Sequence, residues 1–522
     1  MQLFKKYKTN KMKNLSLLLL SFVLLLGTSA CESELDLVPQ GAPSSGNFWK
    51  TPADAKAGVN TIYALYSDDN MYGRGFFWLN NASDDIGTKP RQNAERIKNF
   101  IVDGAESDTK DIWRLHYEVM KRCNDVIRNI PKISLDEKTK NMMLGEAYFN
   151  HAVMHLELAY HYGDDRAGIP IQDRENPSNV YVPRAKNVAE NYAYIAVDLV
   201  KAADLLPYFN ELTPDNYGRA HKTAAWGYLV RTYLYAKDWD NAIKYANMIV
   251  NSGKHKLLDN FEDVFKIKNN WSTEYIWSVT SSSENTGLGS IFPGVCLEDK
   301  GWGVYNGWGN FYPTKELFDT YDPADKRRSA TILQKGDKFM YFGELVTFNE
   351  GKYAVSSSNR TGYQFNKYME PFGYPKTTSG GIDIRYVNAN GDKPSTALNV
   401  PLLRYADVIL MLAEAKLMKG LSADTEINMI RNRAGLPGIS GATLTDLKRE
   451  RRCELAGEWT DRHFDLVRWG DAQATYAKPL HHYNGSVIYP ARNFNPAIHH
   501  VWPIPPDEIA VSKGALTQNK GW

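Results

Sequence analysis

A short glycine-rich stretch in the middle of the chain carries the aromatic side chains best suited to binding chemistry. Trp302, Tyr305 and Trp308 stand among the glycines of residues 301–309. Because glycines have no side chains to cover these rings, we expect that regular packing does not bury all of them. Apolar C–H faces of pyranose rings stack on such aromatics, so the stretch predicts a surface for a ring-shaped ligand. The alternative is that the rings pack the loop onto the protein body or against a partner protein.

A second segment, residues 71–85, provides polar groups that complement those rings. Sugar hydroxyls need planar amides and carboxylates as hydrogen-bonding partners. The candidate ligand contacts of this segment are Tyr72, Arg74, Trp78, Asn80, Asn81 and Asp84. The same alternative applies to them, namely packing against the protein body or a partner.

Signals for catalysis and for metal binding are weak. His151 and His155 share a helix face, but the residues between them lack the glutamate that a zinc protease uses as base, so an ordinary buried helix face is favoured. The pairs Asp84–Asp85 and Asp164–Asp165 are adjacent in sequence. Glycoside hydrolysis needs two opposed carboxyl groups about 5 to 9.5 Å apart. We therefore expect no catalytic residues, no metal and no cofactor.

The first 30 residues have the features of an export signal. Lysines at the start precede an almost unbroken apolar run from Leu15 to Leu26, which is too short to be a stable membrane span. Small residues then precede Cys31, and this arrangement resembles a bacterial lipobox, in which the thiol is acylated. Two or three acyl chains anchor a protein almost permanently. The alternative is an ordinary secretory signal, and translation starts at Met1 or Met12.

Composition excludes a nucleic-acid partner and a disulfide framework. The 522 residues include 62 basic and 60 acidic side chains, and removal of residues 1–30 takes away five lysines to leave 57 against 60. This balance gives no basic field for nucleic acid. After Cys31 only Cys123, Cys296 and Cys453 remain, too widely spaced for a zinc site. We interpret them as small buried apolar residues, with one disulfide as the alternative.

Helical periodicity dominates both ends of the mature chain. Thr51 and Pro52 have the residue types of an N-cap and a first helical turn. The expected helices span residues 53–65, 111–130, 142–162, 188–206, 403–418, 425–434 and 444–456. The segment 223–250 predicts a helix pair with the spacing of a tetratricopeptide repeat. Other pairs share that length without its signature, so we expect degenerate repeats.

Residues 265–400 differ in character from the helical ends. Short strands are expected at 275–279 and 341–346, with a helix near 314–321. Long irregular segments in compact proteins usually carry function. The predicted fold is therefore mainly α, with tetratricopeptide-like helix pairs and a loop-rich, partly β insertion that forms the binding face. The expected parts are a signal of residues 1–30, a tether of 31–46 and a domain of 47–522, divided into 47–264, 265–400 and 401–522.

The C-terminal third carries motifs as well as periodicity. The segment Leu403–Ala415 places Arg404, Asp407 and Glu414 on an apolar helix, and it resembles a hallmark of the SusD/RagB family. Further segments that resemble this family are 48–51, 145–149, 162–163, 430–437, 450–456, 464–470, 503–509 and 518–522. The resemblance covers essentially the whole mature chain.

This resemblance implies an outer-membrane lipoprotein that binds nutrients at the cell surface. Such a protein captures an oligosaccharide and delivers it to a SusC-like TonB-dependent transporter, which it caps like a hinged lid. In this family, ligand contacts tend to fall in the regions of residues 71–85 and 301–309. The acidic tract 32–36 resembles surface-export signals of some lipoproteins and favours an outward-facing location. The implied activity is ligand capture without covalent chemistry.

Three other functions stay open. One is peptide uptake, because some members of this family serve peptide importers. The second is a surface glycosidase, and the third is a scaffold without a small ligand.

The charged residues of the C-terminal motifs predict a structural role. Both signs are present, so paired and hydrogen-bonded contacts can join helix ends to the core. These residues are Arg404, Asp407, Glu414, Arg431, Arg433, Glu450, Arg451, Glu454, Arg462, Asp465 and Arg468.

Overall fold

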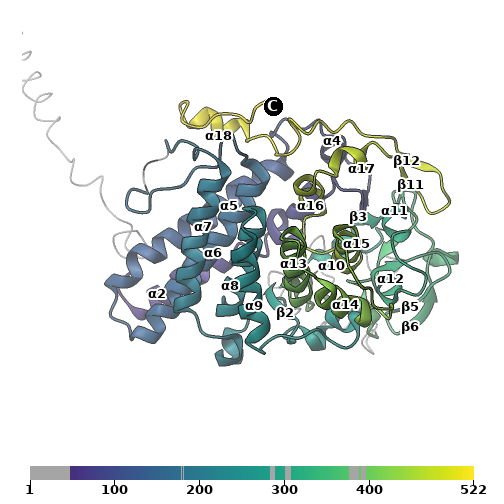
Figure 1. The fold of residues 1–522 in the computed structure, drawn as a ribbon, viewed down its shortest axis with the longest axis horizontal. Coiled ribbons are helices and arrows are strands. Elements are labelled where there is room, and N and C mark those ends of the chain that lie inside the picture. The colour runs from purple at the N-terminus through teal and green to yellow at the C-terminus, as the bar shows by residue number, and fades with distance from the viewer. Residues whose placement is uncertain are drawn as a thin grey trace, which may run out of the picture.

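Helices form both ends of the chain in the computed structural model, and short strands lie between and beside them (Figure 1). The structure describes residues 48–522 apart from 178, 180, 283–288, 300–301, 303–306, 376–386 and 389–394. The predicted residues Cys31 and Tyr305 lie outside this described part. The helices of the first half are α2 (Pro52–Tyr63), α3 (Gly75–Asn80), α4 (Gln92–Lys98), α5 (Ser107–Asn129), α6 (Glu137–Tyr162), α7 (Val188–Leu205), α8 (Lys222–Tyr235) and α9 (Trp239–Asn251). The helices of the second half are α10 (Phe292–Cys296), α11 (Lys315–Phe318), α12 (Lys326–Thr331), α13 (Tyr405–Met418), α14 (Asp424–Arg433), α15 (Leu444–Leu455), α16 (Arg462–Trp469), α17 (Ala472–Tyr476) and α18 (Pro506–Val511).

Local capping residues explain where the predicted helices begin. At the start of α2, the Thr51 hydroxyl accepts a hydrogen bond from the Asp54 amide at 3.2 Å. The Asp54 carboxylate accepts one from the Thr51 amide at 2.7 Å, which completes a capping box. Asp136 caps α6 by accepting from the Thr139 amide at 2.9 Å. The N-cap predicted at Thr51 is therefore confirmed.

Helix α6 is enclosed by other elements along most of its length. Every residue from Gly145 to Tyr162 is buried, as expected for a helix at the centre of a bundle. Its polar side chains meet partners on neighbouring elements: Glu146 with Tyr63 at 2.7 Å, His151 with Asp198 at 2.9 Å, His155 with Asn191 at 2.9 Å, Glu157 with Tyr72 at 2.9 Å, and His161 with Asp461 at 3.0 Å. Because unpaired buried polar groups are costly, these bonds fix how the surrounding elements sit on α6.

Helix pairs follow α6 in sequence and in space. Helix α6 packs on α7, α7 on α8, and α8 on α9, and Figure 1 shows these four helices side by side. The short connection 236–238 makes α8 and α9 antiparallel neighbours. In this pair the rings of Tyr233 and Tyr245 stack with centroids 5.8 Å apart, and Ala242 and Ala246 are buried. The tetratricopeptide-like description predicted from residues 223–250 is confirmed.

Strands of the described residues pair in twos and always antiparallel. The pairs are β1 (Ile86–Thr88) with β3 (Phe311–Pro313), β2 (Tyr275–Val279) with β10 (Val400–Arg404), β4 (Ile332–Leu333) with β7 (Gln364–Phe365), β5 (Lys338–Tyr341) with β6 (Glu344–Thr347), β8 (Val387–Asn388) with β9 (Ser395–Thr396), and β11 (Leu480–His481) with β12 (Val487–Tyr489). The strand expected at 275–279 is confirmed. The single strand expected at 341–346 is wrong, because Phe342 and Gly343 have φ values of 46° and 84° and form the turn of a hairpin.

A buried network of ion pairs joins the C-terminal motifs, as predicted. Arg404 lies 2.5 Å from Glu274, 3.1 Å from Glu454 and 2.5 Å from Glu458. Further pairs are Arg231–Asp407, Arg327–Glu450, Arg431–Glu450, Arg433–Glu274, Arg451–Asp465 and Arg468–Asp465. Burial raises the pKa of Glu454, but nearby guanidinium groups, that of Arg433 first, outweigh burial and lower it to about 2. The network therefore holds charged groups inside the helical body.

The three described cysteines behave as buried apolar residues. Cys123, Cys296 and Cys453 are buried and free, as predicted. No helix of the described residues combines the length and the apolar character needed to cross a bilayer.

Candidate functional site

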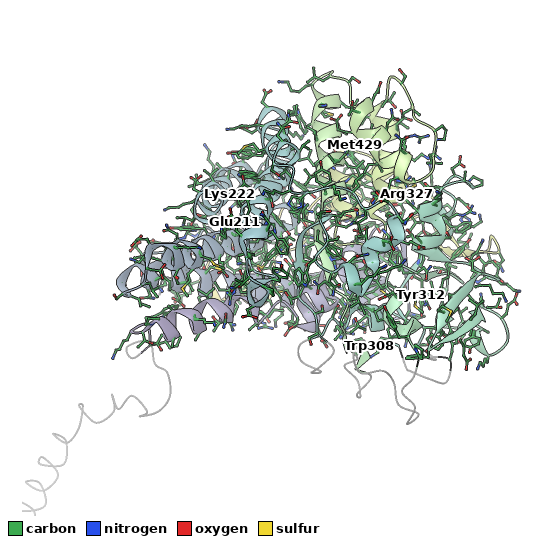
Figure 2. The ribbon with its side chains drawn as sticks, turned by 90° about the horizontal axis from the view of Figure 1, so that it is seen from below. Glu211, Lys222, Trp308, Tyr312, Arg327 and Met429 are labelled. Carbon is green, nitrogen blue, oxygen red and sulfur yellow. The ribbon has the colours of Figure 1, made fainter. Side chains whose placement is uncertain are left out.

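Pairing of β1 with β3 brings the two predicted binding segments together. Ile86 lies opposite Pro313, and Thr88 opposite Phe311, so the ends of segments 71–85 and 301–309 become neighbours. Across this junction the guanidinium carbon of Arg74 lies 4.6 Å from the centroid of the Trp308 ring. Figure 2 shows Trp308 near the edge of the described structure. Two of the predicted residues are thus brought into contact.

Backbone and side-chain contacts hold Trp308 in place. Its amide donates to the Gly294 carbonyl at 2.9 Å, and its carbonyl accepts from Lys89 Nζ at 3.5 Å. Lys89 in turn lies 3.1 Å from Asp299. The Trp308 ring is half-buried, so part of it faces solvent. The sequence interpretation did not include Lys89 and Asp299, although both flank the predicted segments and have the residue types that bind sugar hydroxyls.

Arg74 stands at the corner between the single turn η1 (Asp69–Gly73) and α3. Gly75 allows this corner, because a Cβ at that position would lie 2.0 Å from the Asn70 carbonyl oxygen. Among the described residues, no acceptor bonds to the Arg74 guanidinium, and its buried Nε is unpaired. Burial lowers the pKa of Arg74, and the Asp69 carboxylate opposes that effect.

Trp78, a predicted ligand contact, is buried. Its side chain is 0% exposed, with the Phe311 ring centroid 4.7 Å away and the Arg91 guanidinium 4.6 Å away. Phe311 belongs to β3, and Arg91 lies in the segment before α4. These two elements cover the Trp78 side of α3, which the local sequence pattern does not reveal. Trp78 cannot stack on a ligand without a rearrangement of this core.

Trp302, also predicted as a ligand contact, is buried. It is 5% exposed and its ring lies 5.5 Å from Phe339 and 5.2 Å from Tyr341 by centroid. Its indole N–H donates to the Ala354 carbonyl at 3.3 Å. The β5–β6 hairpin supplies the covering rings, which the glycine-rich stretch itself lacks. The alternative given for these aromatics, packing onto the protein body, therefore holds for Trp302.

Tyr72 and Asn81 lie inside the helical body and not on a surface. The Tyr72 hydroxyl donates to Glu157 at 2.9 Å, and the Asn81 amide nitrogen donates to the Ala94 carbonyl at 2.9 Å. Both side chains are buried, so the exposure that a ligand contact needs is absent. Asn80 is buried as well.

Asp84 and Asp85 join the N-terminal segment to the C-terminal helices. Asp84 lies 3.0 Å from Arg462 Nε and 2.8 Å from Arg452 Nη2, and Asp85 lies 2.7 Å from Arg452 Nε. Burial raises the pKa of Asp84, but Arg452 and then Arg462 outweigh burial and hold it well below its usual range. The role predicted for Asp84 as an exposed ligand contact is therefore corrected to that of a buried ion-pair partner.

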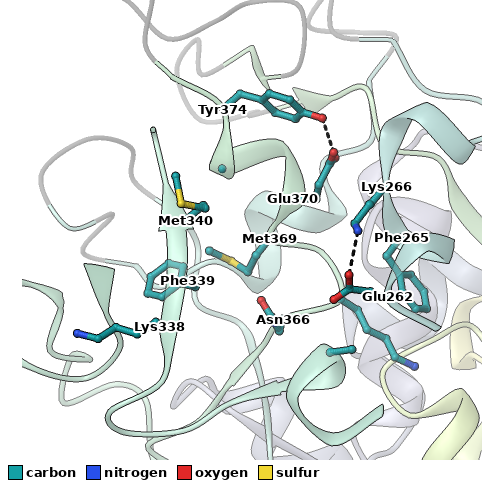
Figure 3. Close-up of a pocket in the computed structure, with 13 residues that line it drawn as sticks. Glu262, Phe265, Lys266, Lys338, Phe339, Met340, Asn366, Met369, Glu370 and Tyr374 are labelled. Atoms are coloured by element: carbon teal, nitrogen blue, oxygen red, sulfur yellow. Dashed lines mark hydrogen bonds and ion pairs between the residues drawn. The ribbon is translucent and has the colours of Figure 1, made fainter. Parts of the chain in front are cut away.

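A cavity of about 360 Å³, which sequence reasoning missed, opens beside the β5–β6 hairpin (Figure 3). Its apolar lining comes from Phe265, Phe339, Met340 and Met369. Four of its polar groups bond in pairs: Glu370 accepts from the Tyr374 hydroxyl, and Lys266 lies 3.1 Å from Glu262. Much of the lining is apolar and several of its polar groups are already paired, so the cavity offers few polar groups to orient a polar ligand.

A second groove of about 350 Å³ lies between α5, residues 170–182 and α18. Trp113 and Tyr117 form its aromatic wall, and Gln172, Asp173 and Glu508 add polar groups. Both aromatic residues lie in the helix predicted for residues 111–130, and the sequence analysis did not single them out. No group of three or more His, Cys, Asp or Glu side chains arranged for a metal occurs in the described part of the chain.

Comparisons with known proteins agree on one family. The model described as the SusD family matches residues 273–522, and a model described as starch-binding and associating with the outer membrane matches residues 51–234. SusD-like protein P2 of Formosa agariphila is 25% identical over 544 aligned positions, which cover 96% of this chain and 99% of that protein.

Solved structures share the fold. A SusD-like protein of Bacteroides fragilis has a TM-score of 0.75 at 24% identity, covering 92% of this chain and 99% of its own. Surface glycan-binding protein A of Bacteroides thetaiotaomicron, solved in complex with laminarihexaose, has a TM-score of 0.70 at 20% identity and covers 90% of this chain and 100% of its own. At these identities the likeness establishes the architecture.

Proposed function

The chain belongs to the SusD/RagB family, and from this premise we propose that it is a cell-surface glycan-binding lipoprotein. It captures an oligosaccharide at the outer membrane and delivers it to a SusC-like TonB-dependent transporter. Support comes from the starch-binding description of the N-terminal family model and from the glycan complex of a structural relative.

The observation that carries the proposal is the half-exposed Trp308 ring beside Arg74. An aromatic face with polar groups around it suits a sugar, whose ring has apolar faces and polar edges. Lys89 donates to the backbone carbonyl of Trp308 at 3.5 Å, and Asp299 lies 3.1 Å from Lys89. We propose that Trp308 is the stacking platform and that Arg74, Lys89 and Asp299 bond to the ligand, with Tyr305 as a further candidate.

The ion pairing of Asp84 and Asp85 agrees with ligand binding without covalent chemistry. Asp84 and Asp85 are held by Arg452 and Arg462 and are not opposed across an open cleft. A glycosidase needs one carboxyl group that can donate a proton and a second that stays ionised. We therefore propose capture and release as the whole activity.

The decisive experiment is titration of the purified mature protein with neutral and acidic oligosaccharides and with peptide pools by calorimetry. We expect a glycan ligand, and we expect Trp308→Ala to weaken its binding about twofold to tenfold, because stacking on one aromatic ring contributes about 0.5–1.5 kcal/mol. Trp239→Ala, at the start of α9, is the matched control and should bind normally. Equal affinity of both variants would reject Trp308 as the platform, and binding of peptides alone would replace the glycan function with peptide uptake. Product formation from any glycan would show a glycosidase.

The membrane anchor is proposed from Cys31. Acylation of its thiol would hold the protein at the outer membrane, and the acidic tract 32–36 would favour the outer surface. We expect Cys31→Ser to release the protein from membrane fractions, and protease treatment of intact cells to digest the anchored wild type. Retention of the variant in membranes, or full protection of the wild type, would contradict the anchor or the orientation respectively.

The helical body offers a surface for the transporter. On α7, Val197 is 66% exposed and Val200 is 37% exposed, and exposed apolar side chains on one helix favour a protein partner. We expect the double variant Val197→Asp, Val200→Asp to co-purify less barrel protein than wild type. Met429→Asp, on the exposed side of α14 (Figure 2), is the control. If both variants co-purify equal amounts of the transporter, α7 is not the contact. If the wild-type protein co-purifies no transporter, the proposed delivery role is rejected.

A further inference from the structure

Among the described residues, the Arg74 guanidinium has no anionic partner, in contrast to the buried Arg404 and the partly exposed Arg91. Arg404 has three carboxylates around it, and Arg91 lies 3.2 Å from Asp108. No hydrogen bond from the Arg74 side chain to an acceptor is found among the described residues, and its guanidinium carbon lies 4.6 Å from the centroid of the Trp308 ring. Its Nε is shielded from water and unpaired.

The buried Nε of Arg74 lacks a hydrogen-bond partner in the part of the chain that the structure describes, and this is energetically unfavourable unless another molecule supplies an acceptor. A buried donor without an acceptor costs about 1–3 kcal/mol, more for a charged group. The planar fork of arginine matches a carboxylate or a sulfate group, which accepts two parallel N–H bonds. Stacking on Trp308 holds the fork in one place, so less side-chain entropy is lost when such a group binds.

The charged residues around Arg74 leave its positive charge able to attract an anionic ligand. Beyond the effect of burial, Asp69 and Asp108 act on Arg74 from nearby and raise its pKa, whereas the neighbouring cation Arg91 lowers it. Asp108 is engaged by Arg91 at 3.2 Å and by the Asn93 amide at 2.9 Å. Lys89 adds a second cation, which donates to the Trp308 backbone carbonyl at 3.5 Å and lies 3.1 Å from Asp299.

We propose that the ligand of the Arg74–Trp308 site is an anionic glycan, with a uronate carboxylate or a sulfate ester that binds the Arg74 fork while a sugar ring packs on Trp308. This inference rests on the proposed glycan-binding function and narrows it to one class of sugar. The shared chemistry is a planar or tetrahedral oxyanion attached to a ring.

The test is calorimetric titration of the whole mature protein with three matched sets of oligosaccharides: neutral, uronate-containing and sulfated. We expect an anionic set to bind at least tenfold more tightly than the neutral set, and the set that binds identifies carboxylate or sulfate. A charged hydrogen bond of about 1.5–3 kcal/mol corresponds to a loss of about tenfold to a hundredfold in affinity for Arg74→Gln. Arg74→Lys, which keeps the charge but not the fork, should retain part of the affinity, and raising the salt concentration should weaken binding.

Controls distinguish failure of the anionic preference from failure of the proposed glycan-binding function. Arg114→Gln, which removes an exposed guanidinium of α5, should leave affinity unchanged. Thermal unfolding of Arg74→Gln should match wild type, so that lost binding is not lost folding. Binding of neutral glycans with full affinity in Arg74→Gln would overturn the anionic preference and leave glycan capture standing. Failure of all three sets to bind would overturn both.

Discussion

The guanidinium carbon of Arg74 lies 4.6 Å from the centroid of the Trp308 ring. Arg74 follows the turn η1, and Trp308 precedes β3, so the contact connects two segments that are far apart in sequence. A cation–π contact of this kind contributes about 0.5–2 kcal/mol, depending on how far it is desolvated. It orients a half-exposed tryptophan and holds an arginine that pairs with no carboxylate in the described part of the chain.

The two tryptophans predicted to share one role should respond differently to truncation. Trp78→Ala removes a fully buried ring between Phe311 and Arg91, so we expect a loss of about 3–5 kcal/mol in the free energy of unfolding. Trp308→Ala removes a half-exposed ring and should cost about 1 kcal/mol or less. Urea unfolding followed by circular dichroism measures both, and a similar loss in the two variants would contradict the packing described for Trp78.

Arg404 should be far more important for stability than its charge alone suggests. Arg404→Met would leave Glu274, Glu454 and Glu458 buried with fewer cationic partners, so we expect a loss of about 3–5 kcal/mol. Arg114→Met breaks an exposed pair with Asp111 and should change stability by about 0.5 kcal/mol or less. Chemical unfolding of both variants provides the comparison, and the prediction fails if Arg404→Met unfolds at the wild-type midpoint.

We expect Gly75 to be required for the tight backbone bend that positions Arg74. A Cβ there would lie 2.0 Å from the Asn70 carbonyl, so Gly75→Ala must shift the backbone and should cost about 1–3 kcal/mol together with ligand affinity. Gly373→Ala is the matched control, because the nearest atom to its new Cβ is 3.4 Å away, an ordinary contact. Indistinguishable melting temperatures for the two variants would argue against the strain at Gly75.

Acid should destabilise the protein partly through His155. Burial lowers the pKa of His155 to about 3, and Asn191 donates to its Nε2 at 2.9 Å, which suits the neutral ring. Between pH 6.5 and 3 the unfolded chain therefore binds a proton that the folded protein excludes, and stability falls as the pH falls, by up to about 1.4 kcal/mol per pH unit for this group. Unfolding free energies measured at pH 4.5, 5.5 and 6.5 should show a shallower slope for His155→Gln, and an unchanged slope would refute this contribution.

Helices could be located from sequence because their signals are local. Thr51 with Asp54, and Asp136 with Thr139, satisfy the first amides of their helices within three residues. The turn at Phe342–Gly343 was missed because the reversal depends on backbone angles, which the strand-forming residue types around it do not reveal.

The sequence by itself determined the family, the helical ends and the two segments that meet at the candidate site, because motifs and periodicity belong to neighbouring residues. Tertiary structure alone decided which aromatics face solvent. Trp78 is covered by Phe311, and Trp302 by Phe339 and Tyr341. Whether a ring is exposed depends on what packs over it, and for Trp78 and Trp302 that cover comes from distant parts of the chain.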